Sequence, residues 1–121
     1  MDVMEAIRGR RSIRRFSREP VSDEEVEKLL DAARWAPSWA NTQCWEFIVV
    51  RDPETKEKLS ELMSPRNPAR EGLKEAPVVL VACARRKLSG YKKGEPVTDK
   101  GGWWYICLLY TSDAADELDG V

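Results

Sequence analysis

The chain has 121 residues, of which 42% are hydrophobic and 34% are charged, and its formal net charge is −1. This composition excludes a disordered protein and fits one soluble globular domain. The absence of histidine excludes Ser-His-Asp and Cys-His catalytic arrangements and most zinc sites, so an enzyme with this sequence is expected to rely on a bound cofactor.

The sequence favours a cytoplasmic protein that does not enter a membrane. The longest apolar run, Ala76 to Ala84, is far too short to span a bilayer. Acidic residues interrupt the first positions and no apolar segment of a signal peptide follows. The cysteines form no CxxC pair and are odd in number, which is typical of reduced thiols: Cys44, Cys83 and Cys107.

The first third of the chain predicts two helices separated by an extended segment. A short helix is expected over residues 2–8, with Asp2 as its N-cap, and Gly9 ends it. Residues 10–20 then read as a loop or an extended stretch. Ser22 and Glu25 form a capping-box pattern, and apolar residues at helical spacing predict a helix over 23–35.

The remainder predicts an alternation of strands and helices. A polar loop over 38–44 leads into a strand at 45–51, and a helix begins at Pro53. Residues 76–84 predict a central strand buried on both faces. A mobile polar loop is expected over 85–102 and a further helix from 103 to 109. This order indicates an α+β or three-layer α/β domain.

The arginine segment, Arg8–Arg18, is the first candidate site. Five arginines fall in the ten residues RGRRSIRRFS, from 8 to 17. Arginine presents a planar fork of donors that fits a phosphate, and serine adds a hydroxyl donor. In an extended chain Arg10, Ser12 and Arg14 face one side. The alternative is a solvated basic surface paired with nearby glutamates.

The second candidate is APSWANTQCWEF, residues 36–47, where a polar loop joins a helix to a strand. Its hydroxyl and amide groups can contact the polar edge of a planar ring, against which Trp39 and Trp45 could pack. The alternative is an ordinary connecting loop built from turn-forming Pro, Ser and Asn.

Taken together, GRRSIRRF and PSWANTQCWEFIVV resemble the nitroreductase family of FMN-dependent oxidoreductases. That family shows Arg-x-Ser-x-Arg after its first helix and a Pro-Ser-x-x-Asn-x-Gln-Pro-Trp-x-Phe loop entering a strand. KEAPVVLVACA, residues 74–84, is similar to its next core strand. The resemblance covers roughly residues 2–106 and implies the family's α+β fold, with three α/β/α layers.

The resemblance implies a homodimer with FMN at the interface and NAD(P)H as reductant. Arg10 and Ser12 would contact the phosphate, Arg11 the ribityl chain, and Arg14 the pyrimidine edge, where a cation favours the reduced ring. The partner subunit would supply its polar loop, namely Pro37, Ser38, Asn41 and Gln43. Asn67 would lie near the O4 edge. Flavin N5 carries the hydride, so no catalytic side chain is expected.

Two departures from the family pattern stand out. Cys44 occupies the position of the family's proline after the loop glutamine. Family members are also much longer, and the chain after Ile106 is acidic where a long apolar helix is expected. We therefore expect residues 1–106 to be the N-terminal part of a nitroreductase-like domain and 107–121 to be a non-native or disordered tail. The alternative is a short protein with an acidic C-terminus.

The sequence thus predicts an oxidoreductase that passes hydride from NAD(P)H through FMN to a nitroaromatic, quinone or similar acceptor. It names neither the acceptor nor the choice between NADH and NADPH. Neither a nucleic acid nor a membrane is expected as a partner. The alternative is a non-enzymatic module that binds an anion or RNA through Arg8–Arg18, and a wide basic face for that role is absent because the other bases are interleaved with acids.

Overall fold

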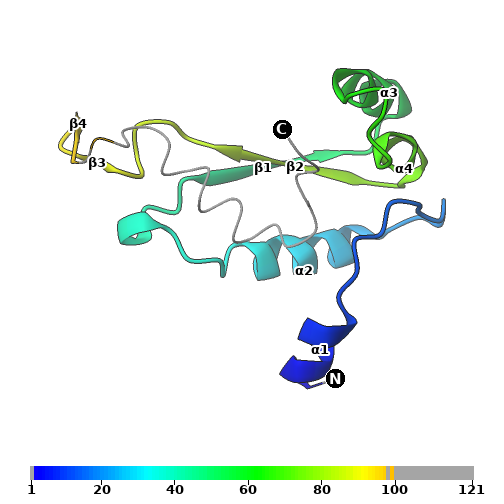
Figure 1. Ribbon diagram of the computed structural model, residues 1–121, viewed down its shortest axis with the longest axis horizontal. Helices are drawn as coiled ribbons and strands as arrows, with labels where there is room; N and C mark the ends of the chain where they lie inside the picture. Colours follow the sequence, from blue (N-terminus) through cyan, green and yellow to red (C-terminus); the bar gives the residue numbers. More distant parts are fainter. Residues whose placement is uncertain (1, 98, 100–121) are drawn as a thin grey trace.

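The computed structural model describes residues 2–97 and 99 (Figure 1). Along this part of the chain, helices and short strands alternate as an α+β arrangement. The elements are α1 (Val3–Gly9), α2 (Asp23–Ala33), the 3₁₀ turn η1 (Trp39–Asn41), β1 (Trp45–Val50), α3 (Pro53–Leu62), α4 (Arg70–Glu75), β2 (Val79–Ala84), β3 (Tyr91–Lys92) and β4 (Glu95–Pro96). Among the described residues no helix is long and apolar enough to cross a membrane.

Strands β1 and β2 form an antiparallel pair whose register runs from Trp45 opposite Ala84 to Val50 opposite Val79. Figure 1 shows α2 along one side of this pair, with α3 and α4 on the other side near the end of β1. Among the described residues the core is small, with four buried apolar side chains: Val26, Cys44, Val50 and Ala76. These come from α2, β1 and the segments that flank the strands, so the strand pair is the centre of the fold.

The prediction that residues 76–84 are buried on both faces was wrong for the described part of the chain. Ala82 is exposed and the other residues of β2 are only half-buried. Its partner strand is similarly open, because Ile48 is 54% exposed and Val49 is 41% exposed. The reason is topological, since within residues 2–97 and 99 the sheet of β2 contains only β1. A continuous apolar run therefore marks a strand whose faces are not covered by the described elements.

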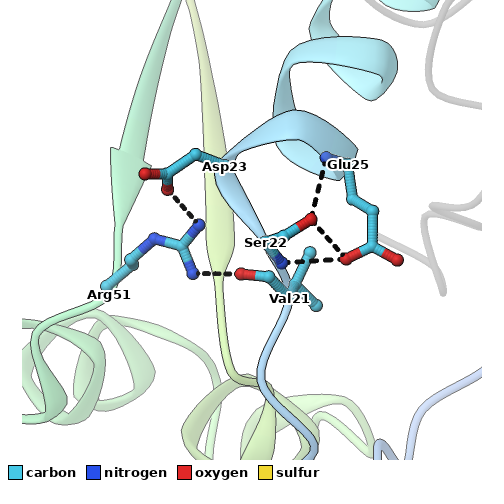
Figure 2. Close-up of polar contacts among 5 residues, drawn as sticks. All are labelled: Val21, Ser22, Asp23, Glu25 and Arg51. Atoms are coloured by element: carbon cyan, nitrogen blue, oxygen red, sulfur yellow. Dashed lines mark hydrogen bonds and ion pairs between the residues drawn. The ribbon is translucent and has the colours of Figure 1, made fainter.

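The N-terminus of α2 carries the predicted capping box (Figure 2). The Ser22 hydroxyl oxygen accepts from the Glu25 N–H at 3.2 Å, and the Glu25 carboxylate accepts from the Ser22 N–H at 2.8 Å. Arg51, at the end of β1, donates to the Val21 carbonyl at 2.7 Å and to the Asp23 carboxylate at 2.8 Å. The chain that leaves the arginine segment is therefore tied both to its own helix and to the end of β1.

We expect Ser22→Ala to lower the free energy of unfolding by about 1 kcal/mol, because the variant loses the acceptor for the Glu25 N–H. Ser17→Ala is the matched control, since the Ser17 hydroxyl accepts a long contact from the Glu19 N–H, at 3.4 Å. Urea unfolding followed by circular dichroism measures both. Equal midpoints for the two variants would contradict this account of the cap.

Helix boundaries agree with the sequence to within two residues. The helix with the Ser22 capping box was expected over 23–35, and it ends at Ala33. Arg34 is the C-cap residue, and its N–H donates to the Leu30 carbonyl. The first helix begins one residue after the predicted N-cap, Asp2, which forms a capping box with Glu5. Proline at 37 is thus preceded by a short turn and not by helix.

The sequence prediction did not include α4, the turn η1 or the hairpin of β3 and β4. Helix α4 was missed because its N-cap, Ala69, offers no capping side chain. The hairpin of β3 and β4 was wrongly expected to be an irregular loop. Its turn is made by Lys93 and Gly94, with φ values of 51° and 84°, the left-handed pair that a two-residue hairpin requires. The helix predicted over 103–109 lies outside the described residues.

Candidate functional site

The arginine segment connects α1 to α2 without regular secondary structure. Its side chains alternate in exposure as an extended chain predicts: Ser12 and Arg14 are half-buried, whereas Arg11 and Ile13 are exposed. Arg10 is exposed as well. Ser12 and Arg14 carry hydroxyl and guanidinium groups that are both suited to an anion, and one shared face for Arg10, Ser12 and Arg14 stays a prediction.

Arg11 is held against the end of the first helix. Its guanidinium donates to the carbonyl of Arg8 at 2.9 Å and to the carbonyl of Arg10 at 2.7 Å. A cation beside the last carbonyls of a helix is favourable because those groups lack partners within the helix. In this chain Arg11 thus caps α1 through a single nitrogen, Nη1.

The far end of the arginine segment is fixed by α4. Arg15 donates through two nitrogens to the Glu75 carboxylate, at 2.9 and 2.7 Å. Gly72 lies directly against the backbone of Arg14, so close that a Cβ on Gly72 would lie 2.1 Å from the Arg14 carbonyl oxygen. Sequence reasoning missed both α4 residues. A glycine within a short helix was the one available signal, because such a position usually has a packing reason.

The ion pair between Arg15 and Glu75 makes the contact between the arginine segment and α4 depend on pH. The hydrogen bond from Arg15 is the main cause that lowers the pKa of Glu75 below its ordinary value, and the Arg15 charge acts in the same direction. A carboxylate with a lowered folded-state pKa contributes stability above its unfolded pKa and loses it as the pH falls through the folded value.

We therefore expect the backbone amides of Arg15 and Phe16 to lose protection from hydrogen exchange at acidic pH, once the pH has fallen through the lowered pKa of Glu75 and its carboxylate takes up a proton. Exchange read by mass spectrometry, with rates corrected for intrinsic pH dependence, measures this. In Glu75→Gln the acid-dependent step should disappear. Protection that stays constant from neutral to acidic pH in the unmodified chain would contradict the assignment.

The polar loop, residues 36–44, has an unusual backbone. Three of its non-glycine residues have positive φ values: Ala40 at 48°, Asn41 at 53° and Gln43 at 47°. The Ser38 hydroxyl accepts from the Gln43 N–H at 2.9 Å, and the Gln43 side-chain amide donates to the side-chain oxygen Oδ1 of Asn41 at 3.1 Å. Such left-handed conformations are strained and often occur at ligand sites. The predicted residues Ser38, Asn41 and Gln43 therefore form one hydrogen-bonded cluster that begins next to Pro37.

A buried polar contact joins the polar loop to the segment before β3. The Ser89 hydroxyl lies 2.8 Å from the Thr42 hydroxyl and donates to the Cys44 sulfur at 3.3 Å. Cys44 and Ser89 are 2% and 3% exposed. Cys44, which replaces the family's proline, is thus a packed core residue whose thiol has a hydrogen-bond donor, and the loop is held from two sides.

Asn67 lies in the connection between α3 and α4. Its side-chain oxygen accepts from the Ala69 N–H at 2.9 Å, while its backbone N–H donates to Ser64 at 2.9 Å. The residue therefore orders the turn that precedes α4, the helix packed on the arginine segment. A contact with a flavin O4 atom would use the Asn67 amide nitrogen as donor, because O4 is a carbonyl oxygen and accepts.

The structure does not bring the two predicted halves of the site together within one chain. The arginine segment and the polar loop adjoin opposite ends of α2, and Figure 1 shows the first beside α4 and the second, which contains η1, beyond the other end of the pair of β1 and β2. The helix between them has 11 residues, which corresponds to about 16 Å. Asn67 belongs to the end that carries the arginine segment. No group of three or more potential metal-ligating side chains occurs among the described residues.

The comparison with known proteins names the class to which this fold and these two motif segments belong. The nitroreductase family matches residues 7–111, and the chain belongs to that family. The matched range extends past the boundary predicted at residue 106, a position outside the described residues. The family assignment predicted from the paired motifs is thus confirmed.

Individual relatives agree with this assignment. A Methanothermobacter thermautotrophicus protein, whose name pairs NADH dehydrogenase with NAD(P)H nitroreductase, is 42% identical over 88 residues, covering 73% of this chain and 44% of its own. A crystal structure of a nitroreductase family protein from Clostridium novyi has a TM-score of 0.69 and 27% identity, covering 93% of this chain and 65% of that one. The chain spans less than half the length of this relative and of a second curated relative, from Archaeoglobus fulgidus.

A third similar protein is known as a complex with a ligand. It is a nitroreductase-type structure in complex with FMN from Exiguobacterium sibiricum, with a TM-score of 0.58 and 32% identity over 69% of this chain and 39% of that chain. The predicted fold class is confirmed by these neighbours, which share the nitroreductase fold.

Proposed function

We propose that this chain supplies the FMN-binding N-terminal part of an NAD(P)H-dependent oxidoreductase of the nitroreductase type. The observation that carries the proposal is an extended, basic segment that is held on α4 and in which Ser12 and Arg14 are half-buried. A similar protein is described in complex with FMN, and a relative's name includes NAD(P)H. The reaction is expected to occur in the cytoplasm.

The donors of the arginine segment fit the phosphate of FMN. Arg10 and Arg14 offer planar, permanently charged donors, and the Ser12 hydroxyl adds a neutral donor from the same stretch. We propose that Arg10 and Ser12 hold the phosphate, that Arg11 lies beside the ribityl chain, and that Arg14 lies at the pyrimidine edge. Bound FMN supplies reversible hydride transfer, and these residues bind and orient it and place a cation where the reduced ring carries negative charge.

The polar loop is proposed to act on the FMN of a second subunit. Within one chain it lies beyond the opposite end of α2 from the arginine segment. A two-fold dimer brings one copy's loop to the other copy's arginine segment at two equivalent sites. Pro37, Ser38, Asn41 and Gln43 would then line the ring, while Asn67 approaches it from the subunit that holds the phosphate. The electron acceptor is proposed to be a nitroaromatic, quinone or similar small molecule.

Anaerobic reduction of the FMN-loaded protein tests the proposed activity. Addition of NADH or NADPH should bleach the visible absorbance of the bound flavin, and a quinone or nitroaromatic compound should then restore it. A protein that holds FMN but shows no bleaching with either reductant would contradict the proposed activity. The alternative function, an RNA-binding module, predicts instead a steeply salt-dependent affinity for RNA and no preference for FMN over riboflavin.

A further inference from the structure

We propose that Gly72 and Glu75 of α4 are positioning residues for the flavin-binding arginine segment. They set the backbone of Arg14 and the course of the chain beside it, although neither belongs to the predicted FMN contacts. The inference rests on the proposed function, because it concerns how this chain holds FMN. It adds a helix that the motif residues do not include.

The contact at Gly72 leaves no room for a side chain. A Cβ built there would lie 2.1 Å from the Arg14 carbonyl oxygen, 2.9 Å from the Arg14 carbonyl carbon and 3.1 Å from Cε2 of Phe16. The first two neighbours are backbone atoms, which cannot swing away as a flexible side chain can. Ordinary van der Waals contact would require a displacement of on the order of 1 Å. The absence of a side chain at position 72 therefore determines how closely the arginine segment approaches α4.

Glu75 fixes the same stretch one helical turn further on. Its carboxylate accepts both donors of the Arg15 fork, at 2.9 and 2.7 Å, and also a hydrogen bond from the Phe16 backbone. The Glu75 side chain is 20% exposed, whereas that of Arg15 is 75% exposed. A two-pronged pair has a defined geometry as well as energy. Gly72 and Glu75 thus hold consecutive residues of the segment.

Helix α4 is itself anchored to α3 by a buried hydrogen bond. The buried Lys56 of α3 donates to the carbonyl of Ala76, the C-cap of α4, at 2.7 Å. Displacement at Gly72 is therefore expected to move the arginine segment and not the helix. Because Arg14 is proposed to contact the pyrimidine edge, its displacement should weaken FMN binding and change the reduction potential of the bound flavin. A misplacement of about 1 Å can cost up to 100-fold in such a site.

The test compares two substitutions by alanine in the 121-residue chain. Gly72→Ala introduces the clash, whereas Leu62→Ala shortens a side chain of α3 that is 83% exposed and is not among the proposed FMN contacts. We expect Gly72→Ala to weaken FMN binding at least tenfold, measured by quenching of flavin fluorescence, and to make the reduction potential of bound FMN more negative. Leu62→Ala should leave the affinity within twofold of that of the unmodified chain and the reduction potential unchanged.

A charge exchange provides a second, gentler test in case Gly72→Ala does not fold. Glu75→Arg should weaken FMN binding and speed hydrogen exchange at residues 15–16. The double variant Arg15→Glu with Glu75→Arg should restore both, because it rebuilds the pair with the net charge unchanged. The reduction potential of bound FMN is measured as well. It should shift in Glu75→Arg and return to the original value in the double variant, a change that loss of a merely structural contact would not produce.

The outcomes separate this inference from the proposed function. If the unmodified chain binds no FMN, the proposed function fails, and this inference fails with it. If the unmodified chain binds FMN while Gly72→Ala and Glu75→Arg bind it equally well with an unchanged potential, only the inference is overturned. Weaker binding in both variants, with recovery in the charge exchange, supports it.

Discussion

Arg10→Ala is expected to lower the affinity for FMN by roughly 10- to 100-fold, the loss typical of a charge-assisted hydrogen bond to a charged group. The reason is local. Arg10 follows directly on α1 and is exposed, and it is proposed to hold the FMN phosphate together with Ser12. Riboflavin, which has the same ring and no phosphate, should bind the variant and the unmodified chain equally. Titrations with both flavins, followed by fluorescence, measure the difference.

Arg34→Ala is the matched control for this prediction. It removes the same charge from a surface arginine whose partner is Asp31, three residues earlier in the chain, at 2.8 Å. Its affinity for FMN should stay within about twofold, because exposed pairs of this kind contribute little. Equal weakening by Arg10→Ala and Arg34→Ala would indicate a general effect of charge and would remove the phosphate assignment.

A mixed dimer is expected to recover FMN binding that each of its parents has lost. One parent carries Arg10→Ala and the other carries Asn41→Gly with Gln43→Gly, where glycine keeps the positive φ values accessible. In a two-fold dimer with shared sites, one site of the mixed dimer contains both altered segments and the other contains neither. Purification through two different tags should therefore yield dimers with about half the wild-type FMN content.

The alternative arrangement gives a different result. If the arginine segment and the polar loop of the same chain served one FMN, each site of the mixed dimer would have one altered segment. Binding would then be no tighter than in the parents. A chain that binds FMN with full affinity as a monomer would also contradict the shared site.

Local signals in the sequence predicted the helices and their starts well. Ser22 with Glu25, and Asp2 with Glu5, are short-range pairs whose hydrogen bonds depend only on residues three positions apart, so they can be inferred without the tertiary structure. The strand at 45–50 was likewise recognisable from its aromatic and β-branched residues.

The parts that could not be predicted depend on distant neighbours. Nothing around Val79–Ala84 shows in sequence that the strand pairs antiparallel with β1 and that its faces lie partly open. Helix α4 could not be predicted from a capping residue, because its N-cap is Ala69. The short hairpin could have been anticipated from Lys93 and Gly94, because glycine in the second turn position is a known signal.

The candidate site divides in the same way. The motif residues Arg10, Ser12 and Arg14 were identified from their order in the sequence, because an extended segment places alternate residues on one face. Gly72 and Glu75 hold this segment in place. They could not be predicted from the motif, because they lie far from it in the sequence: Arg15 and Glu75 are 60 residues apart. Motifs therefore indicate what binds, whereas tertiary contacts show what keeps the binding groups in position.

Equilibrium titration of the chain with FMN, set against riboflavin under the same conditions, tests the central claim most directly. The account predicts saturable binding of FMN that is tighter than that of riboflavin and that weakens with added salt, because the arginine segment is proposed to grip the phosphate. Absence of saturable FMN binding, or equal affinities for FMN and riboflavin, would contradict it.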